Sequence, residues 1–209
     1  MAANVPGYDS GGALTQPDDL LYGAFEDASL TPRGLRQAEC AANALARRPL
    51  VAAYASPYRR AVMTAEAVTR AHKLAVVTHR AFAERDFGQW DGLTAADIAQ
   101  RHPPGISLFD SSPAFAPPGG ESLQAVVERA YPALQQVAAG HAGETVLVVS
   151  HKTLIRALIC HILGIPLERF RRMGQENCAL NVLRMGPESV DVVLINDTCH
   201  LEGAESQCG

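Results

Sequence analysis

The sequence predicts an α/β fold in which helices cover both faces of a central sheet. Two observations lead to this class. Segments with the apolar spacing of helices alternate with short apolar runs along the 209-residue chain, which is the pattern of a helix-covered sheet. Residues 145–149 are almost continuously apolar, as in a central strand that is covered on both faces. We therefore expect a three-layer α/β/α sandwich.

The first half of the chain begins with a segment that lacks strand character. Residues 1–29 contain several Gly and Pro residues and no run of β-branched residues, so we expect a loop there and no regular central strand within residues 1–12. A helix is expected to begin at Thr31, because Thr is a good N-cap and Pro32 suits the first helical turn. The next expected elements are a strand at 51–55, a helix at 57–72 and a strand at 74–78.

The second half contains one long connection and four further elements. Residues 103–120 are rich in Pro, Gly and Ser and predict a surface connection of the kind that often overlies a pocket. The elements expected after it are an amphipathic helix at 121–139, the strand at 145–149, a helix at 152–163, and a strand pair at 179–185 and 190–195. We expect one domain over residues 1–200, with an irregular N-terminal segment 1–29 and a C-terminal tail at 201–209.

Composition argues against several classes of protein. The chain has 18 Lys and Arg, 22 Asp and Glu and a net charge of −4, without a basic stripe that would predict nucleic-acid binding. It contains no apolar run of about 20 residues, the length that a membrane span needs. The five cysteines form no C-x-x-C pair, and no metal-ligand spacing is present, so we expect neither disulfides nor a metal, and a cytoplasmic location.

Three segments carry polar residues suited to a single pocket. They are S-P-Y-R-R-A at residues 56–61, E-R-D-F-G-Q-W-D-G at 84–92 and S-H-K-T-L-I-R at 150–156. His151 lies between a predicted strand and a predicted helix, at the edge of the sheet where α/β proteins bind ligands and where a helix N-terminus favours anions. Arg60, near the start of another helix, is of a type that binds phosphate or carboxylate with two hydrogen bonds.

Together the three segments resemble the histidine phosphatase superfamily, in particular its cofactor-dependent phosphoglycerate mutase-like group. The resemblance covers about residues 30–196 and implies the phosphoglycerate mutase-like fold, small phosphorylated substrates and no cofactor or metal. It implies that His151 holds the phosphoryl group and stabilises the transition state, that Arg60 is the second phosphate-binding arginine, and that Glu84 is the proton donor. Lys152 stands where the family usually has Gly and adds a cation for anion binding. We expect Arg60, Glu84 and His151 to converge.

One half of the family's site is missing from this sequence. The family has an R-H-G motif on its first strand, and that His accepts the phosphoryl group, whereas here no His precedes His72. Counting back from residue 30 places Asp9, Ser10 and Gly11 on the motif, so that only the Gly is retained. A Ser hydroxyl is a poor nucleophile without a base. Asp9 in place of Arg reverses a charge beside a dianion, which at close range is worth on the order of several kcal/mol.

The sequence leaves three functions open. The chain could be a diverged member without the phosphohistidine step that binds or transforms a small anionic metabolite, bearing phosphate or carboxylate, through Arg60, Glu84 and His151. It could be a phosphomonoesterase that uses Ser10 or a water activated by His151. It could also be a non-catalytic binding or scaffold protein, a pseudoenzyme, although the three retained polar residues argue against this. The sequence does not decide whether the protein is an enzyme, and it leaves the substrate and the oligomeric state open.

Overall fold

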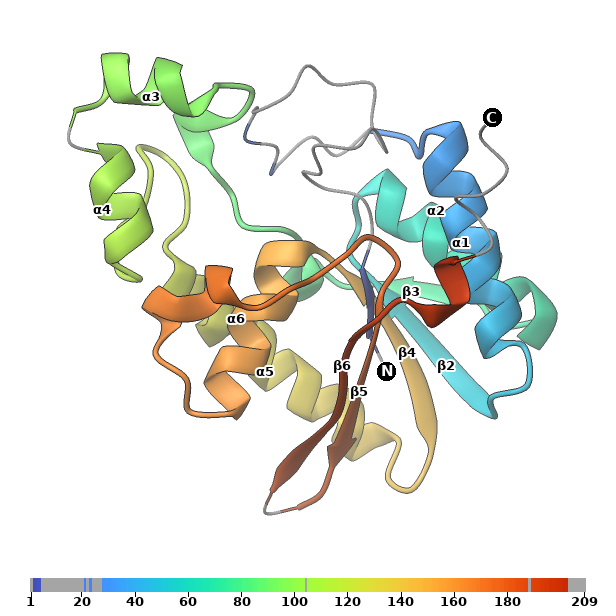
Figure 1. The fold of residues 1–209 in the computed structure, drawn as a ribbon. Helices are drawn as coiled ribbons and strands as arrows, with labels where there is room; N and C mark the ends of the chain where they lie inside the picture. The colour runs from blue at the N-terminus through green and yellow to red at the C-terminus, as the bar shows by residue number, and fades with distance from the viewer. Residues whose placement is uncertain are drawn as a thin grey trace.

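A computed structural model describes residues 2–4, 21, 23, 28–103, 105–187 and 189–202. Its strands form one sheet in the order β3-β2-β4-β1-β5-β6 (Figure 1). Strand β4 pairs in parallel with β2 and β1, β2 pairs in parallel with β3, and β5 is antiparallel to both β1 and β6. The strands are β1 (Ala2–Asn4), β2 (Leu50–Ala55), β3 (Val76–Thr78), β4 (Thr145–Ser150), β5 (Leu180–Met185) and β6 (Val190–Asp197).

The four longer helices cover the two faces of this sheet, as Figure 1 shows. On one face lie α1 (Pro32–Leu45) and α2 (Arg59–Thr69), and on the other lie α5 (Leu123–Gly140) and α6 (Lys152–Ile162). Alternate residues of β4 reach opposite layers: Leu147 and Val149 join the apolar cluster of α1 and α2, whereas Val148 joins that of α5 and α6. Because both faces of β4 are buried, its sequence is almost continuously apolar. The predicted three-layer sandwich is confirmed.

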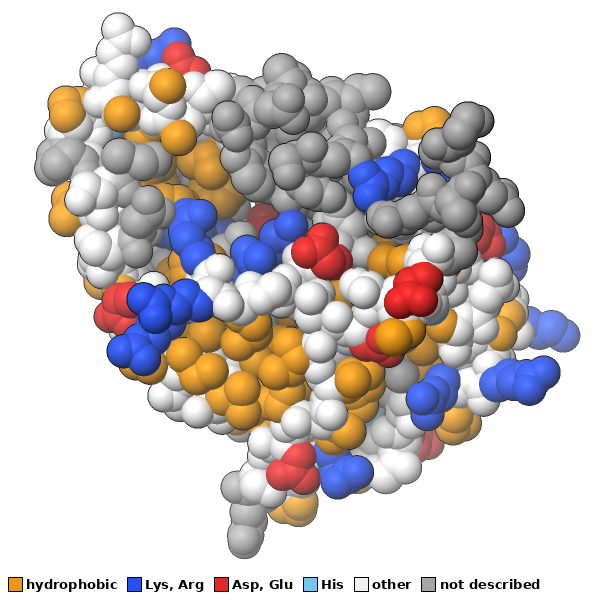
Figure 2. Space-filling model, viewed as in Figure 1, with side chains coloured by type: hydrophobic (Ala, Val, Ile, Leu, Met, Phe, Trp, Pro, Cys, Tyr) orange, Lys and Arg blue, Asp and Glu red, His pale blue; other side chains and the backbone are white. Residues whose placement is uncertain are grey.

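Most of the predicted helices and strands of the sandwich are present with small shifts at their ends. Thr31 caps α1 as expected, and its Oγ1 accepts a hydrogen bond from the Gly34 N–H at 3.1 Å. No helix in the described residues is both long and apolar enough to cross a membrane. On the face drawn in Figure 2, Lys and Arg side chains are interspersed with Asp and Glu instead of forming one continuous basic area.

The expectation of no regular central strand within residues 1–12 is wrong for β1. Ala3 of this short strand pairs with Val149 of β4 on one side and with Leu180 of β5 on the other. Without β1 the facing N–H and C=O groups of β4 and β5 would lack partners, so tertiary pairing outweighs the weak local propensity of the segment. The loop expected over residues 1–29 is wrong at the same place. Residues 5–12 lie outside the described residues.

The connection expected over residues 103–120 is also partly wrong, because it contains the short helix α4 (Gly105–Ser111), and α3 (Ala95–Arg101) precedes it. A reciprocal capping box begins α3: the Thr94 hydroxyl accepts from the Asp97 N–H at 3.0 Å, and the Asp97 carboxylate accepts from the Thr94 N–H at 3.1 Å. Both helices pack on Trp90, which has no exposed surface. This small aromatic core explains why an apparently irregular segment folds into helices.

Candidate active site

The candidate site lies where β2 and β4 end side by side. Ser56 directly follows β2, and His151 directly follows β4 and is the N-cap residue of α6. The parallel ladder continues past both strands, because the Ser56 N–H donates to the Val149 carbonyl at 2.9 Å. This register brings Ser56 Oγ within 2.7 Å of His151 Nε2. Neither residue has exposed surface.

His151 has an environment that favours a neutral imidazole. Burial lowers its pKa well below the usual value, and the positive charges of Arg60 and Arg129 lower it further. The Tyr58 ring packs against the imidazole, with 5.3 Å between ring centroids. Nδ1 is buried and has no hydrogen-bond partner among the described residues. Ser56 therefore contacts one ring nitrogen, and the other has no partner in the described part of the chain.

Arg60 occupies the second position of α2 and is completely buried. Its guanidinium donates to the Gly23 carbonyl at 3.1 Å and lies over the Tyr58 ring, with Cζ 4.9 Å from the ring centroid. Its neighbour Arg59 is exposed. Since Tyr58 contacts both Arg60 and His151, the structure places these two predicted residues around one aromatic ring.

Glu84 reaches the same place from the loop after β3, with 5% of its surface exposed. Its carboxylate accepts hydrogen bonds from the N–H groups of Thr153 at 3.1 Å, Leu154 at 3.3 Å and Arg85 at 2.8 Å. Two of these donors belong to the first turn of α6, for which His151 supplies no side-chain cap. The side chain that caps this helix N-terminus is thus that of Glu84. Sequence reasoning missed this role because the partners are about 70 residues apart.

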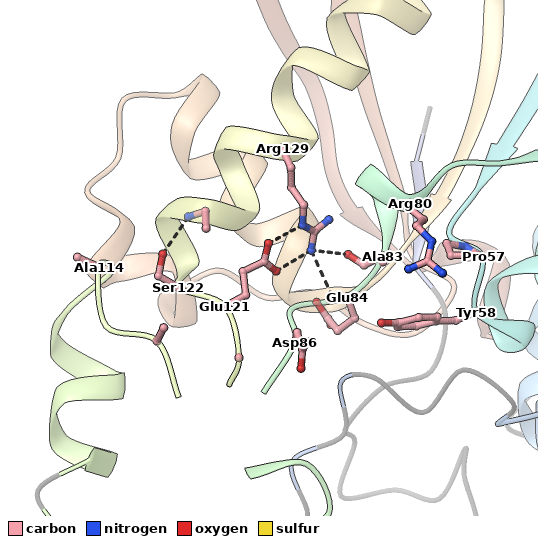
Figure 3. Close-up of a pocket in the computed structure, with 13 residues that line it drawn as sticks. Pro57, Tyr58, Arg80, Ala83, Glu84, Asp86, Ala114, Glu121, Ser122 and Arg129 are labelled. Carbon is pink, nitrogen blue, oxygen red and sulfur yellow. Dashed lines mark hydrogen bonds and ion pairs between the residues drawn. The ribbon is translucent and has the colours of Figure 1, made fainter. Parts of the chain in front are cut away.

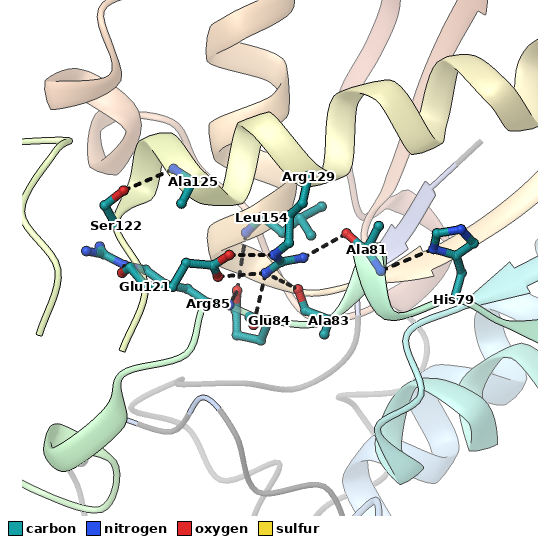
Figure 4. A network of polar contacts seen from close by, with 10 residues as sticks. All are labelled: His79, Ala81, Ala83, Glu84, Arg85, Glu121, Ser122, Ala125, Arg129 and Leu154. Atoms are coloured by element: carbon teal, nitrogen blue, oxygen red, sulfur yellow. Dashed lines mark hydrogen bonds and ion pairs between the residues drawn. The ribbon is translucent and has the colours of Figure 1, made fainter. Parts of the chain in front are cut away.

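Arg129 on α5 fixes the loop that carries Glu84, as Figure 4 shows. Its guanidinium pairs with the Glu121 carboxylate at 2.6 and 2.9 Å and donates to the carbonyls of Ala81 at 2.7 Å and Ala83 at 3.0 Å. A longer contact of 3.3 Å reaches the carbonyl of Glu84. Arg129 was not among the residues that the sequence singled out, because the carbonyls of Ala81, Ala83 and Glu84 that it contacts lie in a distant segment.

A pocket of about 510 Å³ opens beside this network. Figure 3 shows Tyr58 and Arg80 toward one side, Glu121 and Ser122 toward the other, and Glu84 between them. Its full lining is Pro57, Tyr58, Arg80, Ala83, Glu84, Asp86, Ala114, Ala116, Gly120, Glu121, Ser122, Ala125 and Arg129. Arg60 and His151 are not part of this lining, but Tyr58 contacts both and also lines the pocket. Tyr58 therefore connects the buried pair with the pocket.

The other predicted site residues have different positions. Lys152 is the first residue of α6 and is half-buried. Asp9, Ser10 and Gly11 lie outside the described residues. Within the described ranges, no group of three or more His, Cys, Asp or Glu side chains is arranged to hold a metal ion.

Comparisons with known proteins find relatives in sequence and in fold. Phosphoserine phosphatase 1 of Hydrogenobacter thermophilus is 33% identical over 181 residues, covering 86% of each chain. The structure of YhfR from Bacillus stearothermophilus superposes with a TM-score of 0.86 at 25% identity, covering 96% of this chain and 98% of that one. Mycobacterial glucosyl-3-phosphoglycerate phosphatase Rv2419c, in complex with VO3, gives a TM-score of 0.76 at 26% identity over 86% of this chain and 92% of that one.

Some relatives are longer. The chain spans about half the length of the bifunctional protein Rv2228c of Mycobacterium tuberculosis, which is 35% identical over 182 residues, 86% of this chain and 50% of that protein. The family model for branch 1 of the histidine phosphatase superfamily matches residues 12–198. The chain therefore belongs to the histidine phosphatase superfamily.

Proposed function

We propose that this protein binds a small phosphorylated metabolite, with the phosphoryl group between Arg60 and His151 and the organic part in the pocket beside Glu84. The observation that carries the proposal is the shared Tyr58 ring, which contacts Arg60 and His151 and also lines the pocket. The relatives with phosphatase names and the neighbour that holds VO3, a phosphate analogue, support the same ligand class.

The charges of the site suit a phosphate dianion. Arg60 offers a buried guanidinium, a group that forms two parallel hydrogen bonds to phosphate oxygens. His151 is held neutral by burial and by nearby arginines, which lower its pKa. A neutral imidazole keeps one N–H, and that N–H can donate to a phosphate oxygen.

The same proposal includes loss of the phosphohistidine step. The sequence has no His before His72, and the family match begins at residue 12, after the predicted motif positions Asp9, Ser10 and Gly11. A second candidate is hydrolysis of phosphomonoesters by water or by another nucleophile. The observation that favours it is the Glu84 carboxyl group in the pocket wall, where it could protonate a leaving oxygen.

A binding experiment tests the proposal directly. Isothermal titration of the purified protein with orthovanadate and inorganic phosphate is expected to show binding that weakens at least about tenfold in Arg60→Gln. Arg59→Gln is the matched control, because it removes a neighbouring but exposed arginine. Equal affinity in wild type and in a folded Arg60→Gln variant would contradict the site. His151→Asn gives a second route to the same answer if Arg60→Gln does not fold.

Turnover assays separate the two candidates. A panel of sugar, glycerate and aryl phosphates is incubated with the protein, and any acid-labile phosphoenzyme is trapped. Binding without turnover agrees with the first candidate. Turnover without a phosphohistidine that is lost in Glu84→Gln supports the second candidate. A phosphohistidine on His151 contradicts the first candidate and makes His151 the nucleophile of the second.

A further inference from the structure

Ser56 and His151 make a short polar contact within the buried site. Ser56 Oγ lies 2.7 Å from His151 Nε2, and both side chains lack exposed surface. The ladder bond from the Ser56 N–H to the Val149 carbonyl fixes the backbone on the Ser56 side. On the other side, His151 begins α6 as its N-cap. Two strand ends therefore fix the positions of both partners.

A count of hydrogens decides the direction of this hydrogen bond. Ser56 Oγ also accepts a hydrogen bond from the Tyr58 N–H at 3.3 Å. Because an N–H is a donor, it cannot accept the hydroxyl hydrogen of Ser56. A Ser hydroxyl carries one hydrogen, and within the described part of the chain its remaining contact is His151 Nε2. If Nε2 carried a proton and donated to Oγ, both the buried hydroxyl hydrogen and the Nδ1 lone pair would lack partners among the described residues. In the opposite direction only the Nδ1 N–H lacks one. The hydroxyl therefore donates to Nε2.

The protonation state of His151 gives this direction its importance. Burial and the charges of Arg60 and Arg129 lower the pKa of the imidazole, so its neutral form is the resting one. A neutral imidazole has one N–H and one lone pair, and the hydrogen bond made by one nitrogen sets the state of the other. With Nε2 accepting from Ser56, the proton is on Nδ1, which has no partner among the described residues.

We propose that Ser56 is a positioning residue that holds His151 in the Nδ1–H tautomer, so that a buried N–H donor is available to an anionic phosphoryl oxygen. The identity of that acceptor rests on the proposed function, whereas the tautomer does not. Ser56 is assigned no attack on phosphorus. Its only hydrogen is engaged with Nε2, and it is absent from the lining of the pocket.

Imidazole NMR tests the tautomer without any ligand. Long-range proton–nitrogen spectra of the uniformly labelled full chain resolve the two nitrogens of each of its seven histidines, and His151→Asn identifies the relevant signals by their loss. Wild type at pH 7.5 is expected to show a protonated Nδ1 and an unprotonated Nε2 at His151. Ser56→Ala is expected to shift His151 toward a mixture of tautomers or the Nε2–H form, and Ser56→Thr is expected to restore the wild-type pattern.

A matched control and a binding assay complete the test. Thr64→Val removes another fully buried hydroxyl, one on α2 that donates to the Arg60 carbonyl at 3.1 Å, and is expected to leave the His151 signals unchanged. Ser56→Ala is expected to weaken orthovanadate binding about tenfold, equivalent to about 1.4 kcal/mol, with recovery in Ser56→Thr.

The outcomes distinguish this inference from the proposed function. A protonated Nε2 in wild type, or an unchanged His151 spectrum in Ser56→Ala, overturns the positioning role. Unchanged vanadate affinity in Ser56→Ala, together with lost affinity in Arg60→Gln, also overturns it while the proposed function stands. The expected tautomer in a protein that binds neither phosphate nor vanadate supports the role of Ser56 on His151 and refutes the proposed ligand. An acid-stable phosphoserine at Ser56 would replace the positioning role with that of a nucleophile.

Discussion

Replacing Arg129 by Met is expected to destabilise the protein strongly, because one guanidinium serves several partners. Arg129 pairs with both carboxylate oxygens of Glu121 and donates to the carbonyls of Ala81 and Ala83. The pair is mostly buried, with 26% of the Arg129 side chain and 19% of the Glu121 side chain exposed. Arg129→Met preserves the stem but leaves a carboxylate and two carbonyls without this donor.

The expected cost follows from the degree of burial. Breaking a fully buried ion pair costs about 3–5 kcal/mol, and the residual exposure of this pair lets water solvate part of what is left. A loss of about 2–4 kcal/mol is therefore expected for Arg129→Met. The ion pair of Arg70 with Glu39 is the control, since its side chains are 70% and 54% exposed. Arg70→Met is expected to change stability by less than about 0.5 kcal/mol.

Urea denaturation followed by circular dichroism measures both variants. A double-mutant cycle with Glu121→Leu separates the ion pair from the carbonyl contacts. The double variant is expected to recover part of the loss, because it removes the carboxylate that Arg129→Met leaves without a partner. If Arg129→Met costs no more than Arg70→Met, Arg129 does not fix the loop that carries Glu84, and the reasoning fails.

Three further predictions concern a helix cap, pH and a close packing contact. Glu84→Ala is expected to lose about 1–2 kcal/mol of stability, because it removes the cap of α6. Glu84→Gln is expected to lose less, because it keeps an acceptor oxygen. Equal losses of the two variants in urea denaturation would contradict the cap. The pKa values of His151 and His200 are lowered in the folded state. Below about pH 6.5 the unfolded chain therefore binds more protons at these two residues than the folded chain does. The free energy of unfolding is expected to fall as the pH decreases there, by at most about 1.4 kcal/mol per pH unit for each His. A pH profile unaffected by His151→Asn would refute the contribution of that residue. Gly105→Ala is expected to cost about 1–3 kcal/mol, because its Cβ would lie 2.7 Å from the Trp90 ring; an unchanged thermal midpoint would show that the ring moves aside.

The sequence predicted those parts of the fold that depend on local chemistry. Thr31 caps a helix through a partner three residues away, and the apolar run of β4 reports its burial on both faces. Both signals are contained within a few residues. Strand β1 was missed because only its neighbours β4 and β5, far along the chain, make it a strand. The capping box of Thr94 and Asp97 that begins α3 was a local signal that the sequence analysis overlooked.

The candidate site was predictable to the extent that its residues lie in recognisable segments. Arg60, Glu84 and His151 were identified from their motifs. In the structure Glu84 accepts from the first turn of α6, which begins after His151, and Arg60 contacts the Tyr58 ring that also contacts His151. The contacts that support them were not predictable from the same motifs. Ser56 reaches His151 through strand register, and Arg129 reaches the loop of Glu84 from α5. Such pairs depend on how distant segments pack, which no local pattern encodes.

The place of β1 in the sheet has a consequence for assembly of the fold. Among the described strands, β1 is the hydrogen-bonded link between the group β3-β2-β4 and the hairpin β5-β6. Its partners are more than 140 residues away along the chain, and closing so long a loop is slow compared with forming a hairpin. We expect the hairpin and the larger group of strands to form independently and to join late. This seam borders the end of β4, where the chain turns into His151, so the geometry of the site is completed only when the two parts of the sheet close.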